Sequence, residues 1–279
     1  PLSEITFSIL CKVVYLNFPS IYKKEEILFI GDKNPEYVMH MDSLLEVFPE
    51  AKIIHIVRDY RANIISHRKW FPRKNIMILA QKWLLFNRYI EKHKRKGVHP
   101  FYTIRYEDLV ENPEKYSKEI CEFIGITYFP QMLDFHKKIS KTYLEDQDRI
   151  EKNTLHVRML GTLHENLVKP INKEKVDSWK EEMTKNEIII ADFVDGDFAK
   201  KYGYEKITNE RNLKLLIMCI ITRFRYKLDV FIIREYYNLP LWTRPVLRFV
   251  AEKLFDWFGI AHIYNAKYRK RKKHASQKK

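Results

Sequence analysis

The stretch Lys52-Ile-Ile-His-Ile-Val57 constrains the fold of this 279-residue chain more than any other segment. It is β-branched and apolar almost throughout, a pattern typical of a central parallel strand that is buried on both faces. The stretch ends in Arg58-Asp59 and leads into a helical pattern over 62–67. We therefore expect a buried strand followed by a helix. The Arg58 guanidinium then lies at the carboxyl end of the strand, where open α/β sheets bind ligands.

Strand and helix patterns alternate on both sides of this segment. Apolar residues at helical spacing predict helices over 2–18, 35–48 and 75–96, and short apolar runs predict strands at 27–30 and 101–105. A further helix is expected over 113–124, because proline stands in its first turn and Gly125 follows its end. This alternation predicts an α/β domain over residues 1–208, with a mainly parallel sheet flanked by helices.

The C-terminal part of the chain has a different pattern. Residues 209–266 are expected to form an amphipathic helical extension, because 213–233 and 244–260 alternate Leu, Ile, Phe and Trp with Arg and Lys. A basic tail follows over 267–279. The eight Lys and Arg residues after Trp257, with no acid among them, contribute +8 of the chain's net charge of +15.

This basic region allows two interpretations. A basic amphipathic helix with aromatic residues can lie on an anionic membrane surface. Alternatively, its apolar stripes pack on the main domain and the tail is solvated. Nucleic-acid binding is disfavoured, because no known recognition motif accompanies the charge.

Several classes of protein do not fit the sequence. No window approaches 18 uncharged apolar residues and no signal peptide opens the chain, so we expect a cytoplasmic protein, in contact with a membrane only at its surface, if at all. The three cysteines lie about 100 residues apart without CxxC or His pairing, which supports neither a disulfide framework nor a structural zinc site. With no metal-ligand cluster in the sequence, we expect no metal.

Arg58 and Ser66 are the first candidate binding pair. Ser66 falls about two turns along the helix after the strand, so its hydroxyl can face back toward the strand end. A guanidinium fork and a hydroxyl donor together suit a phosphate group. An arginine after a strand is also a common member of a surface ion pair, so the chemistry of these two residues leaves both readings open.

Four blocks of the chain, in order, resemble the PAPS-dependent sulfotransferase family. They are GDKNPEY (31–37), FPEAKIIHIVRDYRANIIS (48–66), IRYEDLVENPEKYSKEICEFIGI (104–126) and VKPINKEKVDSW (168–179). The last block, followed by KKYGYE (200–205), is most similar to the tyrosylprotein and bacterial branches. The resemblance implies a P-loop-like parallel sheet flanked by helices, here with a helical C-terminal extension. It also implies transfer of a sulfuryl group from 3′-phosphoadenosine 5′-phosphosulfate (PAPS), a co-substrate, to a hydroxyl or amine.

The resemblance also assigns roles to individual residues. Arg58 and Ser66 match the pair that grips the 3′-phosphate of the donor, and Tyr106 matches the tyrosine that lies against the adenine. Lys33 stands at the position of the family lysine near the scissile sulfate, where an ammonium group stabilises charge that develops on the leaving phosphate. Asn172 and Trp179 hold their places in a loop that closes over the nucleotide.

The sequence departs from the family pattern at three points. The phosphate-cradling loop of the kind Arg-Ser-Gly-Thr-Thr is absent, and the first glycine is Gly31. The general base of the tyrosylprotein branch, a glutamate soon after that loop, would also precede Pro1. We therefore expect an N-terminally truncated chain that is inactive alone. Asp177 stands where relatives tend to have a small hydroxyl residue, a place that Ser178 could fill instead.

Five other polar residues in or near these blocks receive no catalytic role. Glu36 and His40 fall on the helix after Lys33, and His55 is expected to be a core histidine. Glu107, beside Tyr106, is interpreted as a structural acid or a helix cap, as is Asp108.

Two rival functions remain. A P-loop kinase or NTPase is disfavoured because GxxxxGK[ST] is absent. The second is a non-catalytic, sulfotransferase-like scaffold that binds an anionic polymer or a membrane surface. The acceptor stays open among saccharide, protein tyrosine, lipid and small alcohol, because acceptor pockets come from variable loops.

Overall fold

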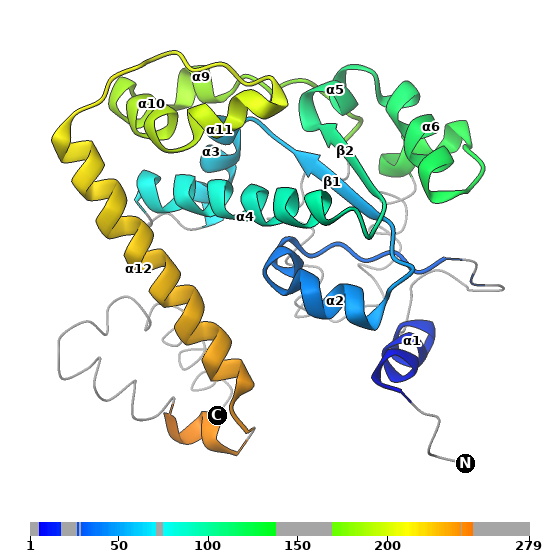
Figure 1. Cartoon of the computed structure of the whole chain (residues 1–279). Coiled ribbons are helices and arrows are strands. Elements are labelled where there is room, and N and C mark those ends of the chain that lie inside the picture. Colours follow the sequence, from blue (N-terminus) through cyan, green and yellow to red (C-terminus); the bar gives the residue numbers. More distant parts are fainter. Residues whose placement is uncertain are drawn as a thin grey trace, which may run out of the picture. The chain divides into compact units, whose positions relative to one another are not determined.

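The computed structural model describes residues 6–17, 27, 29–70, 75–137, 169–240 and 242–247 (Figure 1). In these ranges a small parallel sheet is surrounded by helices, so the expected mixed α/β class is confirmed. The elements are, in chain order, α1 Phe7–Asn17, η2 Pro35–His40, α2 Met41–Val47, β1 Ile53–Val57, α3 Tyr60–Trp70, α4 Ile76–Lys96, β2 Phe101–Arg105, α5 Tyr106–Glu111, α6 Pro113–Ile124, η3 Pro130–Asp134, α9 Trp179–Glu182, α10 Lys185–Ala191, the π-helical turn η5 Asp192–Gly196, α11 Asp197–Ala199, η6 Lys200–Tyr202 and α12 Leu213–Asn238.

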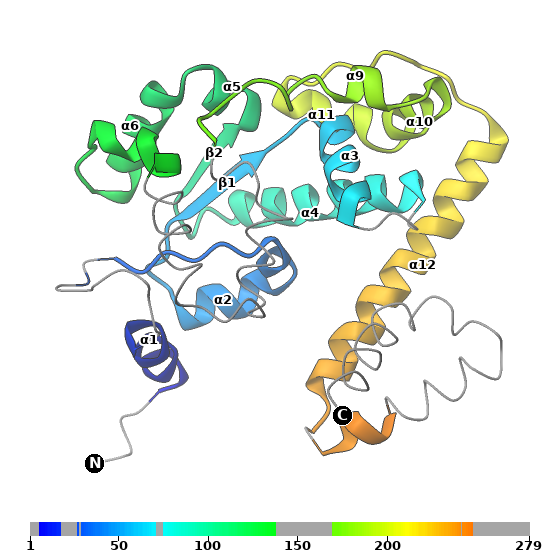
Figure 2. The ribbon, with the colours of Figure 1, turned by 180° about the vertical axis from the view of Figure 1, so that it is seen from behind.

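The two strands run parallel and end together. Ile53 is opposite Phe101 and Val57 is opposite Arg105, so the carboxyl ends of β1 and β2 lie at the same edge. In both views the arrowhead of β1 points toward the start of α3, and α9 and α11 lie beyond that edge (Figure 1) (Figure 2). The chain therefore returns, more than 100 residues after β1, to the edge at which both strands end.

The expected burial of β1 on both faces is wrong. His55 and Val57 are buried, but Ile54 is 38% exposed and Ile56 is 52% exposed. The difference follows from packing, because α4 contacts the His55 face, while Ile54 and Ile56 have no comparable cover. The strand expected at 27–30 is also wrong at the described positions 27, 29 and 30. No strand of the described residues pairs with these positions, and a strand needs such a neighbour.

The helix ends follow the local sequence closely. The Asn75 side chain accepts a hydrogen bond from the Met77 amide (2.8 Å) at the start of α4, and Gly97 ends this helix with a φ of 66°. Gly125 ends α6 with a φ of 85°. Both glycines adopt the left-handed backbone that closes a helix and that other residues rarely tolerate. The expected helices 75–96 and 113–124 are thus confirmed, whereas 35–48 divides into η2 and α2.

Trp83 on α4 contacts several of the elements that surround the carboxyl edge of the sheet. Its ring makes edge contacts with Tyr60 at the start of α3, with Phe198 on α11 and with Tyr202 on η6, at centroid distances of 5.8, 6.3 and 6.3 Å. All of these rings belong to, or pack against, one buried cluster. Such contacts hold the returning segment 179–204 against α3 and α4.

The chain divides into two compact units, 1–222 and 223–279, and the division falls within α12. The boundary expected at 208/209 stays a prediction. The helix expected over 213–233 is confirmed as α12. The tail 267–279 and most of 244–260 lie outside the described residues. In the part of the chain that the structure describes, no helix combines the length and apolarity needed to span a bilayer.

Candidate functional site

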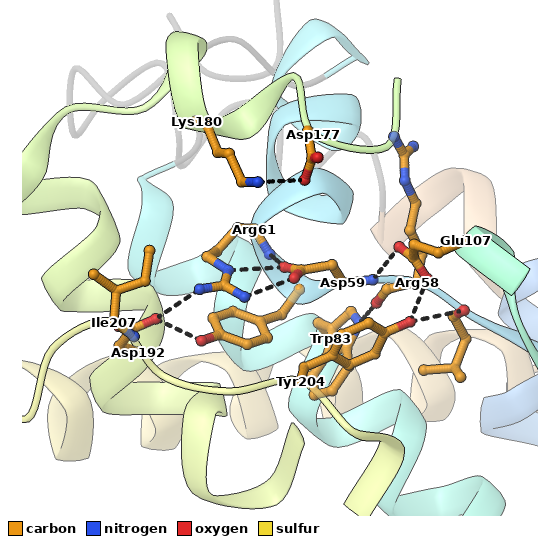
Figure 3. Close-up of polar contacts among 12 residues, drawn as sticks. Arg58, Asp59, Arg61, Trp83, Glu107, Asp177, Lys180, Asp192, Tyr204 and Ile207 are labelled. Atoms are coloured by element: carbon orange, nitrogen blue, oxygen red, sulfur yellow. Dashed lines mark hydrogen bonds and ion pairs between the residues drawn. The ribbon is translucent and has the colours of Figure 1, made fainter. Parts of the chain in front are cut away.

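Arg58 and Tyr106 meet at the carboxyl edge of the sheet. Arg58 follows β1 and Tyr106 follows β2, so the parallel register places them side by side. The guanidinium carbon of Arg58 lies 4.6 Å from the centroid of the Tyr106 ring. The indole N–H of Trp83 donates to the Arg58 carbonyl (3.0 Å), which fixes the backbone from which the guanidinium projects (Figure 3). The site thus begins as a cation stacked on an aromatic ring.

The guanidinium of Arg58 has one recorded hydrogen bond and one buried N–H without an acceptor among the described residues. One terminal nitrogen donates to the carbonyl of Lys175, from the segment that precedes α9. The Nε–H is buried, and no described residue accepts its hydrogen bond. A buried donor without a partner is costly, and an anion is the ligand that a guanidinium pairs with most strongly. This geometry fits a phosphate at the sheet edge.

Next to Arg58, Asp59 and Arg61 form a buried ion pair. Asp59 accepts hydrogen bonds from the Arg61 Nε (3.0 Å), from the Arg61 Nη2 (2.7 Å) and from the Arg61 amide (2.8 Å), and both residues are less than 10% exposed. The Arg61 guanidinium carbon lies 4.7 Å from the Tyr60 ring centroid and 4.0 Å from that of Trp179. This stack ties the start of α3 to the start of α9.

Glu107 links the ends of the two strands. Its carboxylate accepts a hydrogen bond from the Asp59 amide (3.0 Å) and another from the Tyr204 hydroxyl (2.6 Å) (Figure 3). Burial raises the pKa of Tyr204, and the neighbouring Glu107 carboxylate raises it further. Tyr204 therefore stays neutral and donates. These contacts agree with the interpretation of Glu107 as a structural acid.

Two more acids, missed at the sequence level, lie behind this edge in η5. Asp192 accepts hydrogen bonds from the Tyr60 hydroxyl and from the amides of Ile207 and Thr208 (both 2.8 Å). Asp195 is fully buried, and its carboxyl has no hydrogen-bond partner among the described residues. Burial raises the pKa of Asp195 well above its usual range, and the nearby Asp59 charge adds to this rise. The sequence signal that could have revealed these two acids is their position inside the apolar run 188–199.

Neither Ser66 nor Lys33 has a recorded side-chain contact with Arg58 or Tyr106. Ser66 is half-buried in the second turn of α3, and the structure records no contact of its side chain with Arg58 or Tyr106. Lys33 is exposed, just before η2. The Tyr15 and Tyr37 hydroxyls donate to the neighbouring Asp32, and these two bonds lower the pKa of its carboxyl. Of the residues predicted for phosphate, adenine and sulfate, the structure brings only Arg58 and Tyr106 together.

The segment 169–179 lies at the carboxyl edge of the sheet and contains a hydrogen bond of its own. Asn172 accepts a hydrogen bond from the Glu174 amide (3.2 Å), which closes a tight turn. Trp179 is only 5% exposed, and its ring packs on Arg61. The charge of Asp177, which departs from the family pattern, is balanced by Lys180 at 3.1 Å (Figure 3).

The structure also describes the surroundings of three polar residues to which the sequence assigns no catalytic role: His55, Glu36 and His40. His55 is buried, with its Nε2 3.0 Å from the Asn87 Oδ1. Burial lowers the pKa of His55 to about 4, so the expected core histidine is confirmed. Glu36 forms an ion pair with Lys82 (2.7 Å), and His40 is exposed at the end of η2.

Comparisons with known proteins show which family part of the chain is similar to. Residues 10–131 match the model of the sulfotransferase family. The omega-hydroxy-beta-dihydromenaquinone-9 sulfotransferase Stf3 of Mycobacterium bovis is 31% identical over 121 residues, which are 37% of this chain and 31% of that protein. Protein-tyrosine sulfotransferase 1 of Danio rerio is 26% identical over 160 residues, 54% of this chain and 41% of the relative.

A third relative extends the aligned region. Protein-tyrosine sulfotransferase A of Caenorhabditis elegans is 24% identical over 188 residues, 65% of this chain and 46% of the relative. The chain spans less than half the length of each of these three curated relatives. The match to the family model includes β1, β2 and the whole of α3 and α5, and with them Arg58 and Tyr106. Residues 10–131 of the chain are thus similar to the sulfotransferase family.

Proposed function

We propose that the protein is a sulfotransferase that moves a sulfuryl group from PAPS to a hydroxyl or amine of an acceptor. The observation that carries the proposal is the Arg58 guanidinium, stacked on Tyr106 where both strands end, with a buried Nε–H that no described residue accepts. A phosphate satisfies such a donor, and an aromatic ring beside it offers a plane for a base. The match of residues 10–131 to the sulfotransferase family model supports the same chemistry.

Each site residue has a proposed role. Arg58 and Ser66 bind the 3′-phosphate of the donor, the first through a charge-assisted hydrogen bond and the second through its hydroxyl. Tyr106 lies against the adenine. Asn172 and Trp179 contribute through the 169–179 segment, whose Lys175 carbonyl already contacts Arg58.

The role proposed for Lys33 is electrostatic stabilisation during the transfer, in addition to any part in binding the donor. In the transfer, the acceptor oxygen or nitrogen forms a bond to sulfur while the bond from sulfur to the donor phosphate oxygen breaks. The acceptor proton goes to a base, and adenosine 3′,5′-bisphosphate leaves. The Lys33 ammonium is proposed to stabilise the negative charge that develops on the leaving phosphate. No metal enters this proposal.

The acceptor class is proposed no more finely than a hydroxyl or amine compound. The relatives carry names that refer to a hydroxylated dihydromenaquinone and to protein tyrosine, a lipid and a protein. Saccharides and small alcohols are further candidates of the same chemistry. A cytoplasmic location stays a prediction, and the three free cysteines are in keeping with it.

Calorimetric binding of adenosine 3′,5′-bisphosphate tests the proposal without requiring turnover. Arg58→Ala should weaken binding by at least about 2 kcal/mol, since it removes a charge-assisted pair. Lys52→Ala is the matched control, because Lys52 is a cation just before the opposite end of β1. The control should bind like the parent.

Equal affinity of Arg58→Ala and the parent would contradict the assignment of the site. A parent chain that ignores the nucleotide but binds an anionic polymer would favour the non-catalytic scaffold instead.

A further inference from the structure

Helix α12 carries two apolar faces. On its inner face Leu215 is 8% exposed, and Met218 and Cys219 pack against the buried cluster of the first unit. Seven large apolar residues outside this face are 45% to 71% exposed. Because successive residues of an α-helix are rotated by about 100° around its axis, these seven lie on the side away from Leu215. We call them the outer face: Leu213, Leu216, Ile217, Ile220, Ile221, Phe224 and Leu228.

Positive charges border the outer face on both sides. By the same helical geometry, Lys214 and Arg225 fall along one margin, and Arg223 and Lys227 fall along the other. All four side chains are exposed. From residue 213 to 228 the sequence holds no Asp or Glu, and the first acid along the helix is Asp229, four residues after Arg225. Long basic side chains in such positions can lie along apolar surface while their charges reach polar groups.

The outer face is long enough to contact the surface of a membrane or of another macromolecule, rather than a small ligand. From Leu213 to Leu228 the helix rises by about 22 Å, at ~1.5 Å per residue. An exposed apolar stripe of this length is unusual on a soluble surface and marks an interaction site. The basic tail, in the sequence, adds eight more positive charges C-terminal to the helix.

The charges along α12 favour a membrane over a second copy of this chain as the partner of the outer face. If the outer face met the same face of a second copy, four cations from each helix would come together, and residues 213–228 offer no carboxylates to pair with them. Paired helices normally place complementary charges beside their apolar seam. Anionic phospholipids instead offer acyl chains to the stripe and phosphates to both margins.

We propose that the outer face of α12 lies on a membrane surface that contains anionic phospholipid. In this arrangement the apolar side chains reach the acyl boundary, and the four marginal cations contact headgroup phosphates. The inner face stays packed against the cluster that contains Leu215. The proposal concerns a surface distinct from the sheet edge that holds Arg58.

Flotation of the full chain with lipid vesicles tests this proposal. We expect binding to phosphatidylcholine vesicles that contain roughly one third phosphatidylserine, and much weaker binding to pure phosphatidylcholine. The double variant Ile220→Ser/Phe224→Ser should lower the affinity at least about tenfold, because two large apolar groups no longer enter the lipid. The two residues are 59% and 70% exposed, so thermal unfolding should be unchanged.

A matched control separates this face from exposed apolar residues in general. Val98→Ser/Phe129→Ser changes two side chains outside α12 that are 71% and 54% exposed, and it should bind vesicles like the parent. If Ile220→Ser/Phe224→Ser also binds like the parent, the tail alone carries the binding and the proposal is overturned. A parent that ignores vesicles but dimerises in sedimentation, with dimers lost in the double variant, would overturn it in favour of a second copy. Because no nucleotide is present, neither result depends on the function of Arg58.

Discussion

Asp59 holds the Arg61 guanidinium with both of its carboxylate oxygens, one 3.0 Å from Nε and the other 2.7 Å from Nη2. Both residues are buried, the Arg61 guanidinium packs on the Trp179 ring, and its second terminal nitrogen lies 3.9 Å from Asp192. Arg61 is therefore a cation that neutralises two acids at the base of the candidate site. Its removal leaves buried negative charge without a partner.

We expect Arg61→Ala to lower the free energy of unfolding by about 3–5 kcal/mol, the range for breaking a buried ion pair. Denaturant unfolding followed by circular dichroism measures the change. Lys115→Ala, which removes an exposed pair at 4.0 Å, is the comparison and should have little effect. If both variants lost the same small amount, Arg61 would contribute no more than a surface charge.

Asp195 should make the stability depend on pH in the direction opposite to most acids. Burial raises the pKa of Asp195 in the folded chain, so the folded state keeps a proton that the unfolded state releases. Stability is then full below the unfolded pKa of about 3.9 and falls, by up to ~1.4 kcal/mol per pH unit, as the pH rises toward the folded pKa. Asp195→Asn removes this dependence, because an amide releases no proton.

The free energy of unfolding, measured from pH 4 to pH 8 for parent and variant, tests this expectation. Asp195→Asn should match the parent at pH 4 and exceed it increasingly toward pH 8. Asp134→Asn, at a half-exposed carboxylate paired with Lys137, should show no such divergence. Parallel curves for Asp195→Asn and the parent would mean that the Asp195 carboxyl finds a partner or solvent in the folded state.

Trp83 is expected to act as a positioning residue for Arg58. Trp83→Phe keeps an aromatic ring in the core but removes the N–H that donates to the Arg58 carbonyl. Loss of one such bond costs about 1 kcal/mol, so the affinity for adenosine 3′,5′-bisphosphate should fall roughly fivefold. Phe198→Leu, which changes a ring that packs on Trp83 without touching Arg58, controls for general loosening of the core. An affinity loss of the same size in both variants would indicate a packing effect only.

Local sequence determined the strands and helices that depend on near neighbours. The β-branched run before Arg58 forms β1, and the proline and glycine around 113–124 set the ends of α6. The sequence also predicted that Arg58 and Tyr106 lie at strand ends, because each follows a run with the pattern of a strand. Their place at one edge of the sheet follows from parallel pairing, which the alternation of strands and helices already indicated.

Burial and long-range pairing required the tertiary structure. Whether Ile54 and Ile56 are covered depends on which elements pack on that face of β1, and no local pattern states this. The partner of Glu107 is Tyr204, 97 positions away, and nothing in either neighbourhood marks the pair. The unpartnered Asp195 could not be inferred either, because an acid in a helical run is normally placed on the solvent side.

The sequence by itself thus determined the strand–helix alternation, the arginine and the tyrosine at strand ends, and the kinship with sulfotransferases. These depend on residue order and local backbone preference. Only the tertiary structure decided that Arg58 stacks on Tyr106, that Arg61 is shared between Asp59 and Asp192, and that α12 keeps one apolar face exposed. The reason is physical: such contacts join segments distant in sequence, and their geometry is fixed by how whole elements pack.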